Sequence, residues 1–139
     1  AGRLQELRGH ANVISYDYGD IASRLASGSS APDGMVVIPA SMGTLGRVAT
    51  GVSDSLITRT AEVTLKEKRT LILVPRECPY SRIHLQNMLT LDMAGALILP
   101  ASPGFYHKPK SVNELLDFIT AKILTHLGVE QDIVPEWVP

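Results

Sequence analysis

Two hydroxyl groups and a glycine follow the first long apolar run of this sequence, in the order Ser41-Met42-Gly43-Thr44. If a helix begins here, the hydroxyls and the first backbone amides could hold a phosphate, because amides at a helix N-terminus point outward and carry partial positive charge. The other interpretation is that Ser41 and Thr44 only cap that helix, which is the more frequent role of such residues. The spacing matches neither a P-loop nor a glycine-rich dinucleotide motif, so this stretch alone leaves both interpretations open.

A charged pair, Arg76-Glu77, follows a second apolar run. The guanidinium could bind a phosphate through parallel hydrogen bonds, and the carboxylate could transfer protons. A structural ion pair between the two side chains is the alternative, and the sequence does not decide between them. Arg59 and Lys66 lie seven residues apart, which places them on a common face of a predicted helix. They could contact the same anion or remain solvated surface charges.

An aromatic stretch, Phe105–Lys108 (Phe-Tyr-His-Lys), lies in a proline-flanked segment after a third apolar run. It could close over a ligand as a lid, or it could simply pack the loop. His84 and His107 have no metal-ligand spacing with each other or with Cys78, so we expect no zinc site.

The composition fits one globular domain over residues 1–139. The chain is 45% hydrophobic and 19% charged, with a formal net charge of -1. This near-neutral charge offers no basic surface for nucleic acid or an anionic membrane, and no apolar run approaches the roughly 20 residues that span a bilayer. Cys78 is the only cysteine, so an internal disulfide is excluded, which is typical of cytoplasmic proteins. We therefore expect a cytoplasmic protein without nucleic-acid or membrane partners.

The elements that must position these residues can be predicted from the apolar pattern. Runs without polar alternation predict buried strands of a parallel sheet at Met35–Pro39, Thr70–Pro75 and Ala96–Pro100. Residues 12–17 could form a fourth, more exposed strand. Helical patterns lie between and after the strands, at 45–52, 54–68, 82–94 and 111–127. This alternation predicts an α/β fold with a doubly wound parallel sheet. Ligands bind beyond the carboxyl ends of the strands in such sheets, so the three polar clusters should share one edge.

The predicted helices have recognisable ends and apolar faces. We expect Ser53 or Asp54 to cap the 54–68 helix, and Gly95 to follow the 82–94 helix. A capping box of Ser111 and Glu114 opens the last helix, which Gly128 ends. The apolar side chains expected on one face of the 54–68 helix are Leu56, Ile57, Ala61 and Leu65. Those expected on the last helix are Leu115, Leu116, Ile119, Ile123 and Leu127.

Three longer stretches of the chain closely resemble the UbiX-type flavin prenyltransferases, proteins formerly labelled aromatic acid decarboxylases. They read PASMGTLGRVATGVSDSLITRTAEVTLKEKR, LVPRECPYSRIHLQNML and GALILPASPGFYHKPKSVNELLDFITAKIL. The resemblance implies a flavodoxin-like (Rossmann-like) three-layer fold with a parallel sheet. It also implies an enzyme that joins the dimethylallyl group of dimethylallyl monophosphate to reduced FMN without a metal. The product, prenylated FMN, would serve UbiD-type decarboxylases, and members of the family form homo-oligomers, often dodecamers, with sites at subunit interfaces.

The resemblance also implies roles for individual residues. The groups expected to contact FMN are Ser41, Met42, Gly43, Thr44 and Arg76, with Glu77 relaying the proton that the reaction releases. Those expected to bind the phosphate of the prenyl donor, and to stabilise it as it leaves, are Arg59, Lys66, Tyr106 and Lys122. Where this chain has Lys122, the family often has arginine. Lysine keeps the positive charge but cannot bind a phosphate through two parallel hydrogen bonds, as a guanidinium does. The segment Ala26–Ser29 would line the prenyl pocket.

The chain departs from the family at its start. The family begins with a strand and a Gly-x-Ser-Gly-Ala-type turn that helps to bind the flavin, whereas this chain starts with AGRLQELRGHANVISYD. We therefore expect a chain that is N-terminally truncated relative to the family by at least one βα unit, with part of the FMN site missing. The flavin-containing cysteine decarboxylases, which read Pro-Ala-Ser-Ala-Asn-Thr where this chain has Met42-Gly43, are one alternative. A non-catalytic FMN-binding protein is another.

Overall fold

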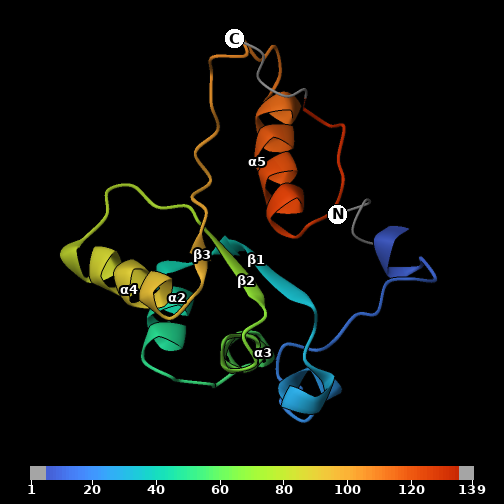
Figure 1. Cartoon of the computed structure of the whole chain (residues 1–139), viewed down its shortest axis with the longest axis vertical. Helices are drawn as coiled ribbons and strands as arrows, with labels where there is room; N and C mark the ends of the chain where they lie inside the picture. The colour runs from blue at the N-terminus through green and yellow to red at the C-terminus, as the bar shows by residue number, and fades with distance from the viewer. Residues whose placement is uncertain (1–5, 135–139) are drawn as a thin grey trace.

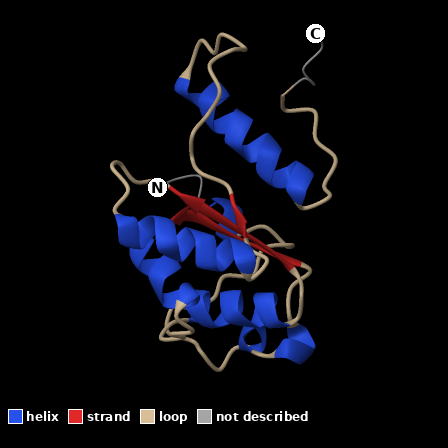
Figure 2. Cartoon of the chain, turned by 60° about the vertical axis from the view of Figure 1, so that its left-hand side comes forward, coloured by secondary structure: helices blue, strands red, loops and turns tan. Residues whose placement is uncertain are grey.

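The computed structural model describes residues 6–134, in which helices cover both faces of a three-stranded parallel sheet (Figures 1 and 2). The strands are β1 (Gly34–Ala40), β2 (Thr70–Pro75) and β3 (Leu97–Ile98), in the order β1-β2-β3. The helices are α2 (Met42–Ala49), α3 (Leu56–Lys66), α4 (Arg82–Met93) and α5 (Val112–His126), with two 3-10 turns, η1 (Arg24–Ala26) and η2 (Gly28–Ser30). Figure 1 shows α5 on one side of the sheet and α2, α3 and α4 on the other. The predicted three-layer α/β arrangement is confirmed.

The strands pair in parallel register with one irregularity. Gly34 lies opposite Thr70 at the start of β1 and β2, and Ala40 lies opposite Pro75 at their ends. The pairing is irregular between Val37 and Ala40, where Pro39 has no N–H to donate. All three predicted strands are present, so the polar clusters do follow strand ends.

β3 is shorter than the predicted strand at 96–100, because only Leu97 and Ile98 pair with β2. Pro100 interrupts the ladder, since it lacks an N–H. The amides of Leu99 and Ala101 still donate to carbonyls of β2 at 2.9 Å. These bonds hold the start of the following loop beside the carboxyl end of β2.

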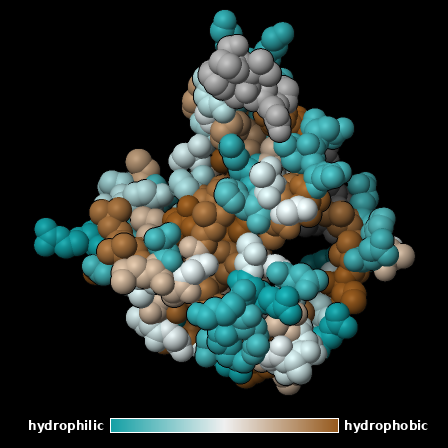
Figure 3. Space-filling model, viewed as in Figure 1, coloured by the Kyte–Doolittle hydropathy of each residue, from teal (hydrophilic) through white to brown (hydrophobic). Residues whose placement is uncertain are grey.

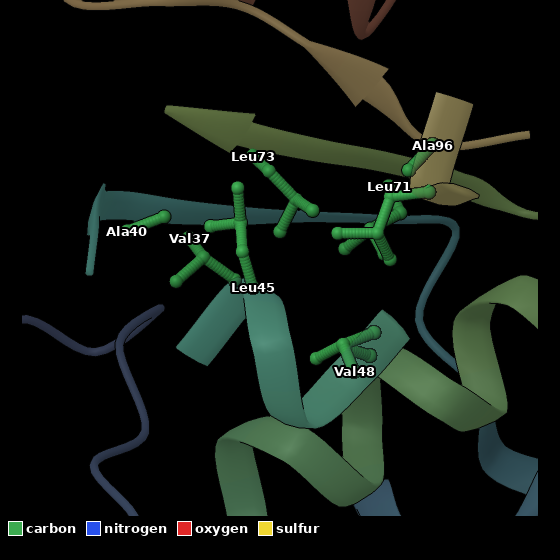
Figure 4. Packing of buried hydrophobic residues seen from close by; sticks show 9 residues of the cluster. Val37, Ala40, Leu45, Val48, Leu71, Leu73 and Ala96 are labelled. Atoms are coloured by element: carbon green, nitrogen blue, oxygen red, sulfur yellow. The ribbon is translucent and has the colours of Figure 1, made fainter. Parts of the chain in front are cut away.

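The larger hydrophobic core lies between the sheet and the layer of α2, α3 and α4. Leu45, Leu71 and Leu73 are fully buried in it. Figure 4 shows Leu45 reaching from α2 toward the sheet, beside Val37. The cap at the start of α2 is therefore anchored to the sheet by the first turn of the helix.

The opposite face of the sheet packs against α5. Ile72 and Val74 of β2 contact a cluster that includes Ile119 and Ile123. Successive residues of β2 thus face different cores, which explains why its apolar run has no polar alternation. Leu116 does not join this cluster and is 58% exposed, so its predicted burial is wrong.

Two predicted elements differ from the observed ones. Residues 13–17 form no strand and have no regular structure. α2 begins at Met42, before the predicted start at 45, because Ser41 caps it.

The predicted cap of α3 is also wrong. Ser55, and neither Ser53 nor Asp54, caps this helix, because Ser55 and Thr58 form a reciprocal capping box in which both residues are buried. The buried face of α3 is rich in threonine, and Ile57 remains 37% exposed.

The glycines that follow α4 and α5 agree with the sequence. Gly95 and Gly128 follow α4 and α5 with positive φ values of 100° and 73°, a conformation that glycine adopts without strain. Ser111 caps α5 and accepts a hydrogen bond from the amide of Glu114 at 3.2 Å, as predicted. The Glu114 carboxylate, however, accepts from the amide of Lys110 at 2.9 Å and not from that of Ser111, so the predicted capping box is only half formed. Within the described residues, no helix is long and apolar enough to cross a membrane.

Candidate functional site

The first predicted cluster lies at the carboxyl end of β1, where Ser41 is the N-cap of α2. Its Oγ accepts a hydrogen bond from the amide of Thr44 at 3.1 Å and lies 2.9 Å from the Thr44 hydroxyl. The capping interpretation is therefore confirmed. The amides of Met42 and Gly43 make no hydrogen bond within residues 6–134. What this turn can offer a ligand is mainly these two backbone N–H groups, reinforced by the helix dipole.

Arg76 and Glu77 follow β2 directly, and both side chains are exposed. No ion pair joins them in the described part of the chain, so the interpretation as a structural ion pair is wrong. The Glu77 carboxylate instead accepts a hydrogen bond from the amide of Cys78 at 3.0 Å, which orients it in the turn. The guanidinium of Arg76 is thereby left able to bind an anion beyond the end of β2.

The loop after β3 packs its aromatic rings onto Phe118 of α5. The ring of Tyr106 meets that of Phe118 edge to face, with centroids 6.0 Å apart and an interplanar angle of 83°. The ring of His107 stacks on Phe118 at 5.5 Å and 3°, and Lys122 Nζ lies 5.9 Å from the centroid of the same ring. Phe118 therefore holds Tyr106 and Lys122, two of the predicted phosphate-binding groups, beside each other.

The interpretation of this loop as simple packing fits some of its residues and not others. Both ring nitrogens of His107 are buried and have no hydrogen-bond partner among the described residues. Tyr106 and Phe105 are 64% and 69% exposed. The Tyr106 hydroxyl thus lies on a surface that a ligand can reach.

Arg59 and Lys66 of α3 lie against the segment Ala26–Ser29, which precedes β1. Arg59 Nε donates a hydrogen bond to the carbonyl of Ala26 at 3.2 Å. Gly28 packs directly against the end of the Lys66 side chain. The structure therefore brings Arg59 and Lys66 together with the segment expected to line the prenyl pocket, whereas Tyr106 and Lys122 form a separate contact on Phe118.

Each of these two cations is paired with a carboxylate of α3 or its C-cap. Arg59 Nη1 lies 3.0 Å from Glu62 Oε2, and Lys66 Nζ pairs with Glu67. A hydrogen bond donated by Ser53, together with one from Arg59, lowers the pKa of Glu62. The hydrogen bond from Lys66 lowers the pKa of Glu67. Both carboxylates are therefore charged at neutral pH, and a phosphate must compete with them for the two cations.

Arg59 and Lys66 lie at one end of the sheet, and the cluster around Ser41 lies at the other. Gly34 pairs with Thr70 at the start of β1 and β2, and Lys66 precedes Thr70 by four residues. Ser41 follows the end of β1, and a strand of seven residues spans roughly 20 Å. In Figure 1, η1 and η2 lie on the side where β1 begins. A single chain thus does not bring Arg59 and Lys66 to the cluster around Ser41.

An apolar cavity of about 440 Å³ adjoins the Arg59 group, between residues 16–18, the start of β1 and α3. Leu25 and Leu56 are among its lining residues. Thr60 also lines it, with a buried hydroxyl that has no hydrogen-bond partner in the described structure. This cavity could not be predicted from the sequence, because the segments that form it are brought together only by the fold.

Phe118 and the carboxylate partners of the cations are two further features of the site that were not predicted from the sequence. Phe118 lies four residues before Lys122, and Glu62 lies three residues after Arg59, so helical spacing was the signal that could have identified both. No group of three or more His, Cys, Asp or Glu side chains in residues 6–134 could hold a metal ion.

Comparisons with known proteins identify the family of this chain. The flavoprotein family model matches residues 12–124. The chain is 61% identical over 112 residues to the flavin prenyltransferase UbiX of Pseudomonas aeruginosa, which covers 81% of this chain and 54% of that protein. It is 45% identical over 136 residues to the flavin prenyltransferase UbiX of Methanothermobacter thermautotrophicus, covering 98% of this chain and 69% of that protein.

Two solved structures have the same fold. The crystal structure of AnUbiX (PadA1) in complex with FMN and dimethylallyl pyrophosphate has a TM-score of 0.90 and 42% identity, covering 95% of this chain and 70% of that one. A dodecameric FMN-dependent UbiX-like decarboxylase from Escherichia coli O157:H7 has a TM-score of 0.88 and 42% identity, covering 91% and 68%. The chain spans between 54% and 63% of the length of several curated relatives that it matches. The sequence matches and the shared flavodoxin-like fold lead to one conclusion: this chain belongs to the flavoproteins and, among them, to the UbiX-type flavin prenyltransferases.

Proposed function

We propose that this chain is a flavin prenyltransferase, which transfers the dimethylallyl group of dimethylallyl monophosphate to reduced FMN. The observation that carries the proposal is the edge formed by the carboxyl ends of β1 and β2, where two unbonded amides of α2 and the exposed guanidinium of Arg76 are available. The similarity to UbiX proteins over most of the chain supports the same activity. We further propose that the enzyme is cytoplasmic and that its product serves UbiD-type decarboxylases.

The donors at this edge fit FMN. The amides of Met42 and Gly43 and the guanidinium of Arg76 suit carbonyl and phosphate oxygens, and Ser41 fixes the turn that presents the amides. When bound, reduced FMN would supply the ring nitrogen and neighbouring carbon that accept the prenyl group. Glu77 lies next to Arg76, with its carboxylate oriented by the amide of Cys78, and is our candidate to take up the proton released in the reaction.

The leaving phosphate needs cationic and hydrogen-bonding partners. As the carbon–oxygen bond of the donor breaks, negative charge develops on the phosphate, and preorganised cations lower the energy of that state. Tyr106 and Lys122, held by Phe118, would supply one hydroxyl and one ammonium group. Arg59 and Lys66 would supply two further cations once the phosphate displaces Glu62 and Glu67.

The separation between the two groups supports a site shared between copies of the chain. Arg59 and Lys66 lie near the amino ends of the strands, whereas Ser41 and Arg76 lie at the carboxyl ends. A second copy could provide the distant cations, and one solved relative is dodecameric. We therefore propose that the enzyme is a homo-oligomer, as a dodecamer or a related assembly.

Mass spectrometry of the flavin tests this proposal. The purified protein is incubated with reduced FMN and dimethylallyl monophosphate, and the flavin mass should rise by one prenyl unit. The variant Glu77→Gln keeps the shape of the side chain but cannot take up the proton, so transfer should slow by a factor of roughly 100 or more. Glu130→Gln, at an exposed carboxylate elsewhere, is the matched control and should transfer at the unchanged rate. An unchanged flavin mass together with release of carbon dioxide from a peptidyl-cysteine would identify a cysteine decarboxylase instead.

A further inference from the structure

The outward face of α4 carries apolar side chains that are exposed within the described residues. Ile83 and Met93 are 71% and 79% exposed, and Leu85 and Leu89 are 53% and 51% exposed. Only Leu91 of this helix is fully buried. In Figure 3, apolar side chains gather on the surface over α4, on the left of the view. Exposed apolar side chains grouped on one helix mark interaction surfaces on soluble proteins.

The pattern along this face is symmetric. Arg82, Leu85, Leu89 and Asp92 follow one another at spacings of 3, 4 and 3 residues, which is the seam that one helix presents to another. Read in either direction, the seam has a charged residue at each end and two leucines between them. The charges at the two ends are opposite, and neither Arg82 nor Asp92 forms an ion pair within residues 6–134.

We propose that α4 packs antiparallel against α4 of a second copy of this chain, about a two-fold axis. In this arrangement Leu85 of one copy meets Leu89 of the other, and Arg82 meets Asp92, each pair occurring twice. A parallel arrangement would instead bring like charges together at both ends of the seam. The charge pattern therefore favours α4 of a second copy as the partner, in the antiparallel orientation.

Leu85 and Leu89, each about half exposed, form the centre of the contact and would be covered by the same two residues of the second copy. The solved dodecameric relative, at 42% identity, is an assembly of many copies of one fold. This contact concerns assembly alone, so it can be tested without any flavin and stands apart from the proposed reaction.

Charge reversal at the ends of the seam tests the proposal. Three variants of the full chain are compared with the unchanged chain by light scattering over a concentration series: Arg82→Glu, Asp92→Arg and the double variant. Each single variant places like charges together twice per contact, so the dissociation constant should rise at least tenfold. The double variant restores opposite charges in both pairs and should recover the assembly. Single variants that assemble like the unchanged chain, or a double variant that assembles no better than the weaker single variant, would overturn the proposal.

Cross-linking gives a second, independent measurement. Leu85→Cys and Leu89→Cys are made separately in a Cys78→Ser background, which removes the exposed native thiol. Under mild oxidation, a mixture of the two chains should form disulfide-linked dimers, because residue 85 of one copy faces residue 89 of the other. Either chain alone should form far fewer. Equal cross-linking in the mixture and in the separate chains would contradict the antiparallel arrangement, as would no cross-linking in an assembled mixture.

Discussion

Replacing Phe118 by leucine should loosen the part of the site that holds Tyr106 and Lys122. The Phe118 ring makes an edge-to-face contact with Tyr106, a stacked contact with His107 and a cation–π contact with Lys122. Aromatic pairs contribute about 0.5–1.5 kcal/mol each beyond their buried area, and an exposed cation–π contact contributes about 0.5–1 kcal/mol. Leucine keeps most of the apolar volume of the side chain but cannot make the three ring contacts. We therefore expect Phe118→Leu to lower the free energy of unfolding by about 2 kcal/mol.

The effect on function should be larger on donor binding than on turnover. With Tyr106 and Lys122 no longer held together, the KM for dimethylallyl monophosphate should rise about tenfold, which corresponds to roughly 1.4 kcal/mol. Phe118→Tyr keeps the ring and should restore both values.

The assay is urea unfolding combined with steady-state kinetics at varied donor concentration. Phe105→Leu is the matched control, because Phe105 belongs to the same loop and its ring is 69% exposed. The control should change the free energy of unfolding by less than about 0.5 kcal/mol. If Phe118→Leu behaves like this control, or if it lowers stability without changing the donor KM, Phe118 does not position the phosphate-binding groups.

Three further predictions follow from the packing and the charges. Gly104→Ala should displace the Tyr106 ring, because a Cβ at this position would lie 2.6 Å from Tyr106 Cε1. The ring is largely exposed and can move, so the expected loss in urea unfolding is about 0.5–1.5 kcal/mol, the value of its edge-to-face contact with Phe118, whereas Ser102→Ala should have no such effect. Leu73→Ala should lower the free energy of unfolding by about 2–5 kcal/mol, because Leu73 is fully buried. Leu116→Ala, on the exposed side of α5, should lower it by less than about 0.5 kcal/mol. Equal decreases for the two variants would contradict the observed exposure of Leu116 on α5. The Ser53 hydrogen bond lowers the folded-state pKa of Glu62 below its ordinary value of 4.5, so its contribution to stability is present above that value and is lost as the pH falls through the lower folded pKa. Glu62→Gln should therefore flatten the fall in unfolding free energy between neutral pH and about pH 3, and an unchanged slope would refute this account.

The sheet and most helix ends could be predicted because each depends on a short, local pattern. The run from Thr70 to Pro75 is apolar at every position after the first, and its two faces meet separate cores. Gly95 and Gly128 end helices through a backbone conformation that glycine adopts without strain. The error at 12–17 has the opposite cause. A short, more exposed strand was expected there, but no strand of the described sheet pairs with it.

The candidate site could be predicted where a residue follows a strand end, as with Ser41 and Arg76. It could not be assembled from the sequence where contacts join distant segments. The hydrogen bond from Arg59 to Ala26 spans 33 positions, and the rings on Phe118 come from a loop and a helix. The competition of Glu62 for Arg59 depends on side-chain geometry that spacing only suggests. The family resemblance predicted which cations belong to the site. That Arg59 and Lys66 lie far from Arg76 could be learned only from the fold.

The turn after β1 has a consequence for how this site tolerates mutation. Ser41 and Thr44 use their hydroxyl groups on each other and on the cap, and the amides of Met42 and Gly43 remain as donors. Every amino acid except proline carries a backbone N–H, so the side chain at 42 can vary while both donors persist, whereas a Cβ at 43 would lie 3.2 Å from Arg47 Nη1. Purifying selection should therefore act most strongly on Ser41, which sets the path of the backbone, and on the packing of Leu45 that anchors it. In a mutational scan of residues 41–45, we therefore expect proline and loss of the Ser41 cap to be harmful, and most other side chains to be tolerated at 42.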